Sequence, residues 1–349
     1  MKATYELPIP EHYDPQQVDQ VWKVPYEERA QQAIEWREEH RIQPASEDTF
    51  RIALFIVDAQ NTFCLPDFEL YVAGRSGTGA IDDTRRLVEF IYRNLAAISE
   101  VTLTMDTHQA TQIFHAIFLI NDEGEHPGPL TMITAEDIRR GRWKFNAKVA
   151  PSLGIDPQYG QRHLDHYVNE LEKRAKFDMT IWPYHAMLGS IGHALVSSLE
   201  EALFFYTIAR YEQPEIVLKA GNPLSEHYSA LGPEVTQGPD GKKIGAKNEK
   251  VFQQLQEVDA MIIAGQAKSH CVAWTIDDLL TDIRDQDERL AEKVYLLEDC
   301  SSPVVVPDVV DFTDEAEAAY EKFSRAGVHT VRSTQPIEQW PGIKVLNPD

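Results

Sequence analysis

The chain has 349 residues and a formal net charge of −23, from 33 basic and 56 acidic residues. This length is enough for one large domain or two, and the negative charge argues against nucleic acid or an anionic membrane as a main partner. No apolar run approaches the roughly 18 residues of a membrane helix, and residues 1–15 lack the apolar core of a signal peptide. We therefore expect a cytoplasmic globular protein.

Residues 1–48 are predicted to form an N-terminal extension with one charged helix over 26–41. Prolines at four positions interrupt the first half of this extension. The helix is a candidate for docking on the rest of the chain or on a partner subunit, and we expect a homo-oligomer. Residues 49–349 are predicted to form one domain.

From residue 50 onward, short apolar runs alternate with amphipathic helical stretches. Strands are predicted over 52–57, 101–105, 215–218, 258–264, 294–297 and 328–331. Helices are predicted over 82–98, 191–211, 272–283 and 315–326. The strands lack clean polar alternation, which is typical of strands buried on both faces. The pattern predicts an α/β fold with a mostly parallel sheet of about six strands.

Two segments interrupt this rhythm. Residues 121–176 form a long insertion with a turn-rich start and a charged helix near 161–175. Residues 231–250 contain Gly-Pro-Asp-Gly-Lys-Lys and are predicted to form an exposed hairpin or loop. Long insertions beside strand ends often supply lids and pocket walls.

Polar and nucleophilic side chains follow four of the predicted strands. Asp58, Asp106, Lys219 and Cys271 come directly or shortly after a strand. Ligands of open α/β sheets bind at the carboxyl ends of the strands. Cys271 lies at a strand-to-helix turn, where the positive end of a helix favours the thiolate. These residues are therefore candidates for one catalytic site.

The three cysteines and the glycines argue against two other kinds of site. The cysteines at 64, 271 and 300 are odd in number and contain no C-x-x-C pair, which argues against a disulfide framework or a thiolate zinc site. The glycine cluster at 74–79 does not follow a strand and lacks a Lys-Ser or Lys-Thr pair. We therefore expect no nucleotide cofactor.

Several motifs occur together in one order along the chain. They are Asp58-Ala-Gln-Asn-Thr-Phe63, Asp106-Thr-His108, Trp182-Pro-Tyr-His185, Lys219 followed by Tyr228-Ser-Ala230, and Ala264-Gly-x-Ala-x-x-x-Cys271-Val. This set resembles the isochorismatase-like cysteine hydrolases, and within them the nicotinamidase-like branch. The resemblance covers residues 50–335 and leaves out the extension and the 121–176 insertion. It implies a Rossmann-like three-layer α/β/α sandwich.

The resemblance also implies a catalytic triad. Cys271 would be the nucleophile, Asp58 the base that takes its proton, and Lys219 a cation beside both. The backbone N–H groups of Ala267 and Cys271 would form the oxyanion hole, with a cis peptide bond between Gln266 and Ala267. The product would form through a thioester on Cys271.

Aromatic side chains are the substrate-binding candidates that the resemblance implies. Phe63 and Trp182 would enclose a flat ring, with Tyr228 beside them, although ordinary core packing also explains buried aromatic residues. His227 precedes Tyr228 and could contact the same substrate.

A divalent metal site of zinc type is a further implication. Asp106, His108 and His185 match three ligand positions of the resemblance. The fourth position falls on Gln112, which is a poor zinc ligand, and His115 lies three residues further on. Three readings stay open: a weaker metal, His115 in place of Gln112, or a histidine cluster without metal.

The function predicted from the sequence is hydrolysis of a small planar carboxamide to an acid and ammonia. A vinyl-ether hydrolase of isochorismatase type is the first alternative, and the joint presence of Asp58, Lys219 and Cys271 argues against it. Ureido or carbamoyl substrates remain open within the amidase class. A scaffold without activity is the non-enzyme alternative, against which the intact triad argues.

Overall fold

The computed structural model describes residues 6–174 and 177–343. The chain divides into two compact units. Unit 1 takes Met1–Met105, Ala194–Val217 and Glu249–Asp349, and unit 2 takes Asp106–His193 and Leu218–Asn248. The predicted boundary between residues 48 and 49 stays a prediction. Within the described ranges, no helix is both long and apolar enough to cross a lipid bilayer.

A six-stranded sheet in the order β12-β9-β8-β1-β2-β7 is the centre of the fold. Its strands are β1 (Ile52–Val57), β2 (Glu100–Met105), β7 (Glu215–Leu218), β8 (Ala260–Gly265), β9 (Val294–Leu297) and β12 (His329–Val331). The pairings of β1 with β2 and β8, and of β9 with β8 and β12, are parallel. All six predicted strands are confirmed, with ends that differ by two residues at most.

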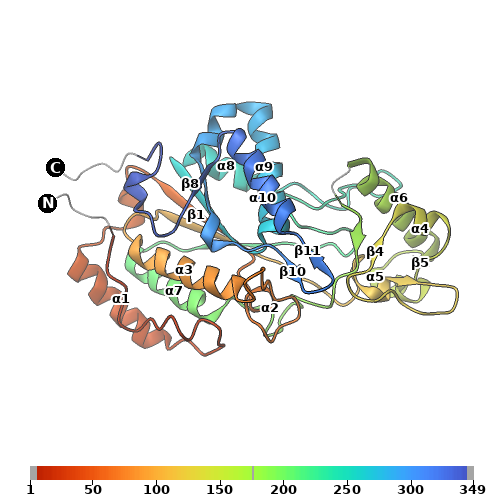
Figure 1. Ribbon diagram of the computed structural model, residues 1–349, viewed down its shortest axis with the longest axis horizontal. Coiled ribbons are helices and arrows are strands. Elements are labelled where there is room, and N and C mark those ends of the chain that lie inside the picture. The colour runs from red at the N-terminus through yellow and green to blue at the C-terminus, as the bar shows by residue number, and fades with distance from the viewer. Residues whose placement is uncertain (1–5, 175–176, 344–349) are drawn as a thin grey trace. The chain divides into compact units, whose positions relative to one another are not determined.

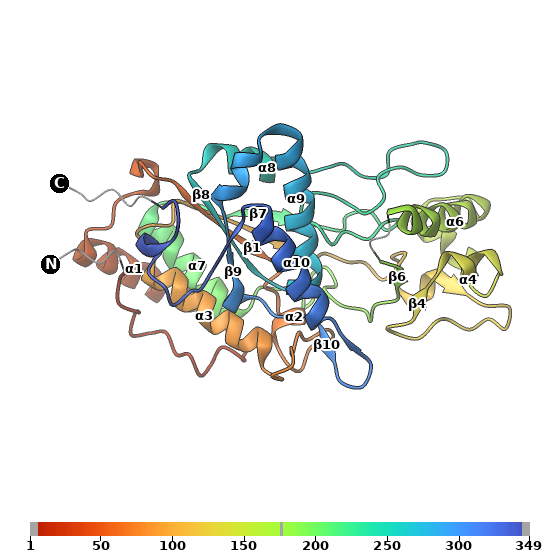
Figure 2. The same cartoon turned by 45° about the horizontal axis from the view of Figure 1, so that its top comes forward.

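Helices cover both faces of this sheet, as Figures 1 and 2 show. The helices of one face are α3 (Gly79–Arg93) and α7 (Ser197–Arg210); those of the other are α8 (Lys250–Glu257), α9 (Ala273–Gln286) and α10 (Thr313–Arg325). The predicted three-layer sandwich is therefore confirmed. The sequence prediction missed α8, and it began the 191–211 helix six residues too early.

The two central strands of the sheet are buried along their whole length. All six residues of β1 and all six of β8 are buried. Their sequences, Ile-Ala-Leu-Phe-Ile-Val and Ala-Met-Ile-Ile-Ala-Gly, contain no polar side chain. Such strands can only be stable between two helical layers, because both faces are apolar.

The N-terminal helix α1 (Tyr26–His40) packs against α7 within unit 1 (Figure 1). Its Ala33 is fully buried, and Arg29 forms a 2.6 Å ion pair with Glu201 of α7. The helix predicted over 26–41 is confirmed to within one residue. Docking on the rest of its own chain is thus one role that the helix fulfils.

Unit 2 contains one long helix, α6 (Pro157–Arg174), and several short elements joined by irregular connections. The short elements are α4 (Ala135–Arg139), α5 (Ala150–Leu153), and the antiparallel pairs of β3 (Leu119–Ile120) with β5 (Lys144–Phe145) and of β4 (Met132–Ile133) with β6 (Met179–Thr180). The helix predicted over 161–175 begins four residues earlier, and its residue 175 lies outside the described residues. A Cβ on Gly160 would lie 2.2 Å from the Phe145 ring, so glycine allows α6 to approach β5 closely.

Outside these layers, α2 (Asn61–Cys64) follows β1, and β10 (Val305–Val306) pairs with β11 (Val310–Asp311) in an antiparallel hairpin. In unit 2, an antiparallel bridge between Gln237 and Lys243 closes a turn around the predicted Gly-Pro-Asp-Gly sequence. The segment 231–250, predicted to be a hairpin or loop, therefore contains a hairpin turn in its middle.

Candidate functional site

In unit 1, Asp58 and the turn that carries Cys271 leave the same end of two paired strands. The pairing of β1 with β8 places Val57 opposite Gly265, the last residue of each strand. Asp58 is fully buried, with φ +45°, a conformation that Asp tolerates better than most side chains. The Thr104 hydroxyl of β2 donates to Asp58 Oδ1 over 2.6 Å and accepts from the Asp58 backbone N–H over 3.1 Å. The carboxylate is thereby fixed at the strand end.

The turn after β8 requires the glycine that begins it. Gly265 has φ +113°, and a Cβ there would lie 2.1 Å from the carbonyl oxygen of Val57. The next residue, Gln266, donates its backbone N–H to that same oxygen over 2.7 Å. The peptide bond between Gln266 and Ala267 is cis, as expected from the sequence. The chain thus turns while still hydrogen-bonded to β1.

Cys271 lies in a π-helical turn, Lys268–Val272, which continues directly into α9. The carbonyl of Ala267 accepts from the backbone N–H groups of His270 and Val272 over 3.0 and 3.2 Å. The cysteine is buried, with 7% of its surface exposed. The predicted position, at the start of a helix after a buried strand, is confirmed. Backbone N–H groups at a helix start favour a thiolate and can hold an oxyanion.

Side chains from α3 and α10 hold this turn in place. Gln266 donates from Nε2 to Asp83 over 2.9 Å, and burial raises the pKa of Asp83 to about 6. The buried Lys268 donates to Glu317 over 2.7 Å and lies 4.3 Å above the Tyr320 ring. No local sequence motif points to these residues, because their partners are far away along the chain.

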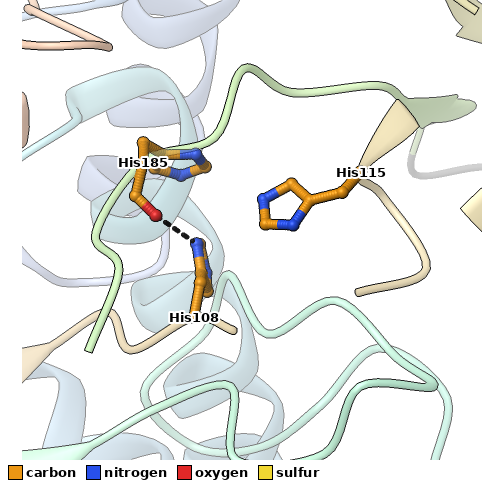
Figure 3. A group of neighbouring side chains, drawn as sticks. All are labelled: His108, His115 and His185. Carbon is orange, nitrogen blue, oxygen red and sulfur yellow. Dashed lines mark hydrogen bonds between the residues drawn. The ribbon is translucent and has the colours of Figure 1, made fainter. Parts of the chain in front are cut away.

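In unit 2, three buried histidines come together (Figure 3): His108, His115 and His185 have ligand nitrogens that all lie within 4.8 Å of one another. Each ring is held at Nδ1 by a backbone carbonyl. His108 Nδ1 lies 3.1 Å from the carbonyl oxygen of His185, His115 Nδ1 lies 3.2 Å from that of Ala110, and His185 Nδ1 lies 2.7 Å from that of Pro183. A carbonyl accepts only, so each Nδ1 carries a proton.

This arrangement leaves the Nε2 lone pairs for a metal ion. Burial lowers the pKa of His115 to about 4 and that of His185 to about 3, so both are neutral at physiological pH. His115 Nε2 is buried and has no hydrogen-bond partner in the described part of the chain. Neutral imidazoles oriented by carbonyls at the other nitrogen are the usual form of metal-bound histidine.

Asp106 adds a carboxylate to the histidine cluster. Its Oδ1 lies 3.0 Å from His108 Nε2, and its Oδ2 lies 3.8 Å from His185 Nε2. Burial favours the neutral carboxyl, but the electrostatic interactions with His108 and Lys219 outweigh it and hold the pKa of Asp106 well below its usual range. The short Asp106–His108 contact is satisfied either by a proton on Nε2 or by a metal ion that both atoms bind. The donor set of three imidazoles and one carboxylate fits zinc.

The structure brings His115, and not Gln112, into this cluster. Gln112 is buried and donates from Nε2 to the carbonyl of Ala220 over 3.2 Å. Its amide therefore holds the backbone beside Lys219. The choice between the two residues as ligands was open in the sequence, because both follow Asp106 in the same irregular segment. His115 as a ligand is a proposal that this geometry favours.

Trp182 and Tyr228 both bind a buried carboxyl group in unit 2, that of Glu226, which no sequence motif predicts. Glu226 Oε1 accepts from the Tyr228 hydroxyl over 2.6 Å and from the Trp182 indole over 3.2 Å, and Oε2 accepts from Tyr167 over 3.1 Å. Burial raises the pKa of Glu226 to about 8. Phe63, the third predicted substrate residue, is buried in the hydrophobic core of unit 1. The roles of these aromatic residues stay predictions.

Lys219 is fully buried at the end of β7 and belongs to unit 2. Its Nζ donates to the carbonyls of Tyr228 and His227 over 3.0 and 3.3 Å. A buried ammonium group needs such acceptors and a compensating negative charge, and Asp106 of the same unit interacts with it electrostatically.

Known proteins are similar to this chain in structure but only distantly similar in sequence. No protein-family model and no curated protein matches the chain. Among solved structures, it is similar to a nicotinamidase/pyrazinamidase of Acinetobacter baumanii (18% identity, 82% of this chain and 99% of that chain, TM-score 0.49). It is also similar to the yeast nicotinamidase bound to nicotinaldehyde (16%, 80% and 99%, 0.49) and to a pyrazinamidase of Pyrococcus horikoshii in complex with zinc (18%, 81% and 99%, 0.41). At these identities and TM-scores, activity must be inferred from the chain's own residues.

Proposed function

We propose that the protein is a cysteine-dependent amidohydrolase, similar to nicotinamidases, that converts a small planar carboxamide into an acid and ammonia. The observation that carries the proposal is the paired ending of β1 and β8. Asp58 and the turn that carries Cys271 both follow these paired strand ends, which supports Asp58 as the base for the Cys271 thiol. A carboxylate base and a thiol at a helix start are the parts that nucleophilic attack on a carbonyl requires.

In the proposed reaction, Asp58 takes the proton of the Cys271 thiol, and the thiolate sulfur attacks the amide carbon. The carbonyl becomes an oxyanion, which the backbone N–H groups of Ala267 and Cys271 stabilise. The oxyanion then re-forms the carbonyl, the C–N bond breaks, and Asp58 returns its proton to the leaving nitrogen, so ammonia departs. Water, deprotonated by Asp58, hydrolyses the thioester; the acid leaves and the thiol is restored.

Lys219 is proposed to make two negative charges tolerable during this reaction. Its ammonium group is held in place by two backbone carbonyls. A positive charge favours both the Asp58 carboxylate and the Cys271 thiolate. Phe63, Trp182 and Tyr228 are proposed to bind the planar part of the substrate, because flat aromatic faces suit a flat ring.

A divalent ion is proposed to bind to Asp106, His108, His115 and His185. The tautomers that the backbone carbonyls impose, and the unpartnered His115 Nε2 in the described residues, support this ligand set. When bound, the ion would supply a Lewis acid that attracts an electron-rich atom of the substrate or a water molecule. The protein residues themselves keep the imidazoles neutral and oriented.

A screen for ammonia release tests the proposal. Nicotinamide, pyrazinamide, ureido acids and aliphatic amides are offered to the wild-type protein and to Cys271→Ala, with isochorismate as a separate arm. We expect turnover of at least one planar amide by the wild type alone. Turnover of isochorismate by both proteins, without ammonia from any amide, would favour the vinyl-ether hydrolase. No turnover of any compound would contradict the proposal and favour a scaffold.

A further inference from the structure

His227 holds the backbone of Ala220, directly after Lys219. The backbone N–H of Ala220 donates to His227 Nδ1 over 2.9 Å, and its carbonyl accepts from Gln112. Ala220 has φ +58°, a conformation that is unfavourable for a non-glycine residue. Two side chains therefore fix the residue that follows the proposed catalytic lysine.

This hydrogen bond also determines which nitrogen of His227 carries a proton. Because a backbone N–H only donates, Nδ1 must be the acceptor, and the proton of the neutral ring lies on Nε2. Burial, with the nearby charge of Lys219, lowers the pKa of His227 to about 3, so the ring is neutral at physiological pH. The result is a fixed N–H donor at Nε2.

That donor has no acceptor within the protein. His227 Nε2 is buried and makes no hydrogen bond to any residue in 6–174 or 177–343. A buried donor without a partner destabilises the folded protein. A histidine whose task was only to hold Ala220 would not need to bury its second nitrogen in this way.

The surroundings of the ring indicate what its acceptor is. The carbonyl of His227 itself accepts from Lys219 Nζ, and Lys219, Asp106 and His108 interact electrostatically with the imidazole. These are the proposed catalytic lysine and two proposed metal ligands, all in unit 2. The unsatisfied donor therefore lies among groups that are proposed to act on substrate.

Two other roles do not fit this geometry. His227 cannot act as a metal ligand or general base through Nδ1, because the Ala220 N–H occupies that lone pair. It cannot do so through Nε2 while that nitrogen carries the proton. The ring is left with one function toward a ligand, which is to donate a hydrogen bond.

We propose that His227 determines substrate specificity by donating its Nε2–H to an sp² acceptor atom of the planar amide. The acceptor is the amide oxygen or a nitrogen of the substrate ring, both of which present an in-plane lone pair. The inference rests on the proposed amidohydrolase function. It adds a substrate contact outside the triad, the aromatic residues and the metal ligands.

A matched pair of substitutions separates this role from the structural one. The amide oxygen of Asn reaches the position of Nδ1, so His227→Asn keeps an acceptor for Ala220 and loses the distal donor. The amide nitrogen of Gln reaches the position of Nε2, so His227→Gln keeps the donor and loses the acceptor. We expect kcat/KM for nicotinamide to fall about 10- to 100-fold in His227→Asn, mainly through KM, and about threefold or less in His227→Gln.

Comparison of nicotinamide with benzamide identifies the acceptor. If the ring nitrogen accepts, His227→Asn loses activity only toward nicotinamide; if the amide oxygen accepts, the loss is equal for both compounds. The reverse order of the two variants, or equal losses in both, would show that His227 only holds Ala220 and would overturn the inference.

A binding measurement keeps the inference separate from the reaction. In ¹⁵N-histidine-labelled Cys271→Ala protein, which leaves the amide intact, the Nε2–H proton of His227 should shift downfield when the amide binds. If the wild type hydrolyses no amide, the proposed function fails, and this titration with the same amides and their acids still decides the donor role. An unchanged Nε2–H resonance at saturating ligand overturns it.

Discussion

The two units hold their candidate site residues in different ways. In unit 1, Asp58 and Cys271 follow long, fully paired strands, and the register of β1 with β8 sets their positions. In unit 2, the histidines lie in irregular segments and are fixed by hydrogen bonds between side chain and backbone, and Glu226 is held by aromatic side chains. Regular pairing makes the first group predictable from sequence, whereas the second depends on contacts that no periodicity encodes.

The largest effect is expected at the strand-end cysteine of unit 1. Cys271→Ala should lower ammonia release at least about 10³-fold, equivalent to about 4 kcal/mol of transition-state stabilisation, because the nucleophile is removed. Cys300→Ala, which removes another buried thiol of the same unit, should keep activity within about twofold. Comparable activity in the two variants would contradict the role of the β1–β8 strand ends.

The next largest effect is expected at Glu226, the buried carboxyl group of unit 2, and concerns how the free energy of unfolding depends on pH. The pKa of Glu226 is about 8 in the folded protein and about 4.5 when unfolded, so the folded state retains a proton that the unfolded state loses between these values. Stability therefore falls as pH rises through this window and levels off above it.

Glu226→Gln imitates the protonated carboxyl group and removes this dependence. The free energy of unfolding of the variant, relative to wild type, should rise by about 3 kcal/mol between pH 5 and pH 8.5. Urea denaturation at the two pH values measures it. Parallel stability profiles would show that Glu226 is ionised throughout and that burial is not the dominant influence.

Metal affinity distinguishes two residues of the same irregular segment. His115→Ala should weaken zinc binding about 50-fold, because one imidazole ligand is lost, whereas Gln112→Ala should change it by about threefold or less. Competition with a chelating dye measures both dissociation constants, with His166→Ala as a control outside the cluster. A larger loss in Gln112→Ala would return the ligand role to Gln112.

The smallest effect is expected at Lys268, whose contacts with α10 hold the turn that carries Cys271. Lys268→Met keeps the aliphatic stem but removes the ion pair with Glu317 and the cation–π contact with Tyr320, so it should cost about 1–2 kcal/mol of stability. Lys322→Met removes a surface ion pair with Asp277 and should cost about 0.5 kcal/mol or less. Thermal unfolding of both variants checks the difference. Equal costs would mean that the turn does not depend on Lys268.

These contrasts explain how much the sequence could predict. The six strands were found because uninterrupted apolar runs such as β1 leave few alternatives, and Gly265 identified the turn after β8. The helix α8 was missed because eight residues carry little periodicity. The choice of His115 over Gln112 depends on the path of an irregular segment. The role of Glu226 depends on two aromatic donors from distant positions in the chain, Tyr167 and Trp182.

The measurement that tests the central claim most directly is mass spectrometry of the protein quenched during turnover of its best amide. The peptide that contains Cys271 should gain the mass of the substrate minus ammonia, and the adduct should disappear with hydroxylamine, which cleaves thioesters. Cys271→Ala should show no adduct. Full ammonia release without any adduct at Cys271, or an adduct on another residue, would contradict the proposed thioester mechanism.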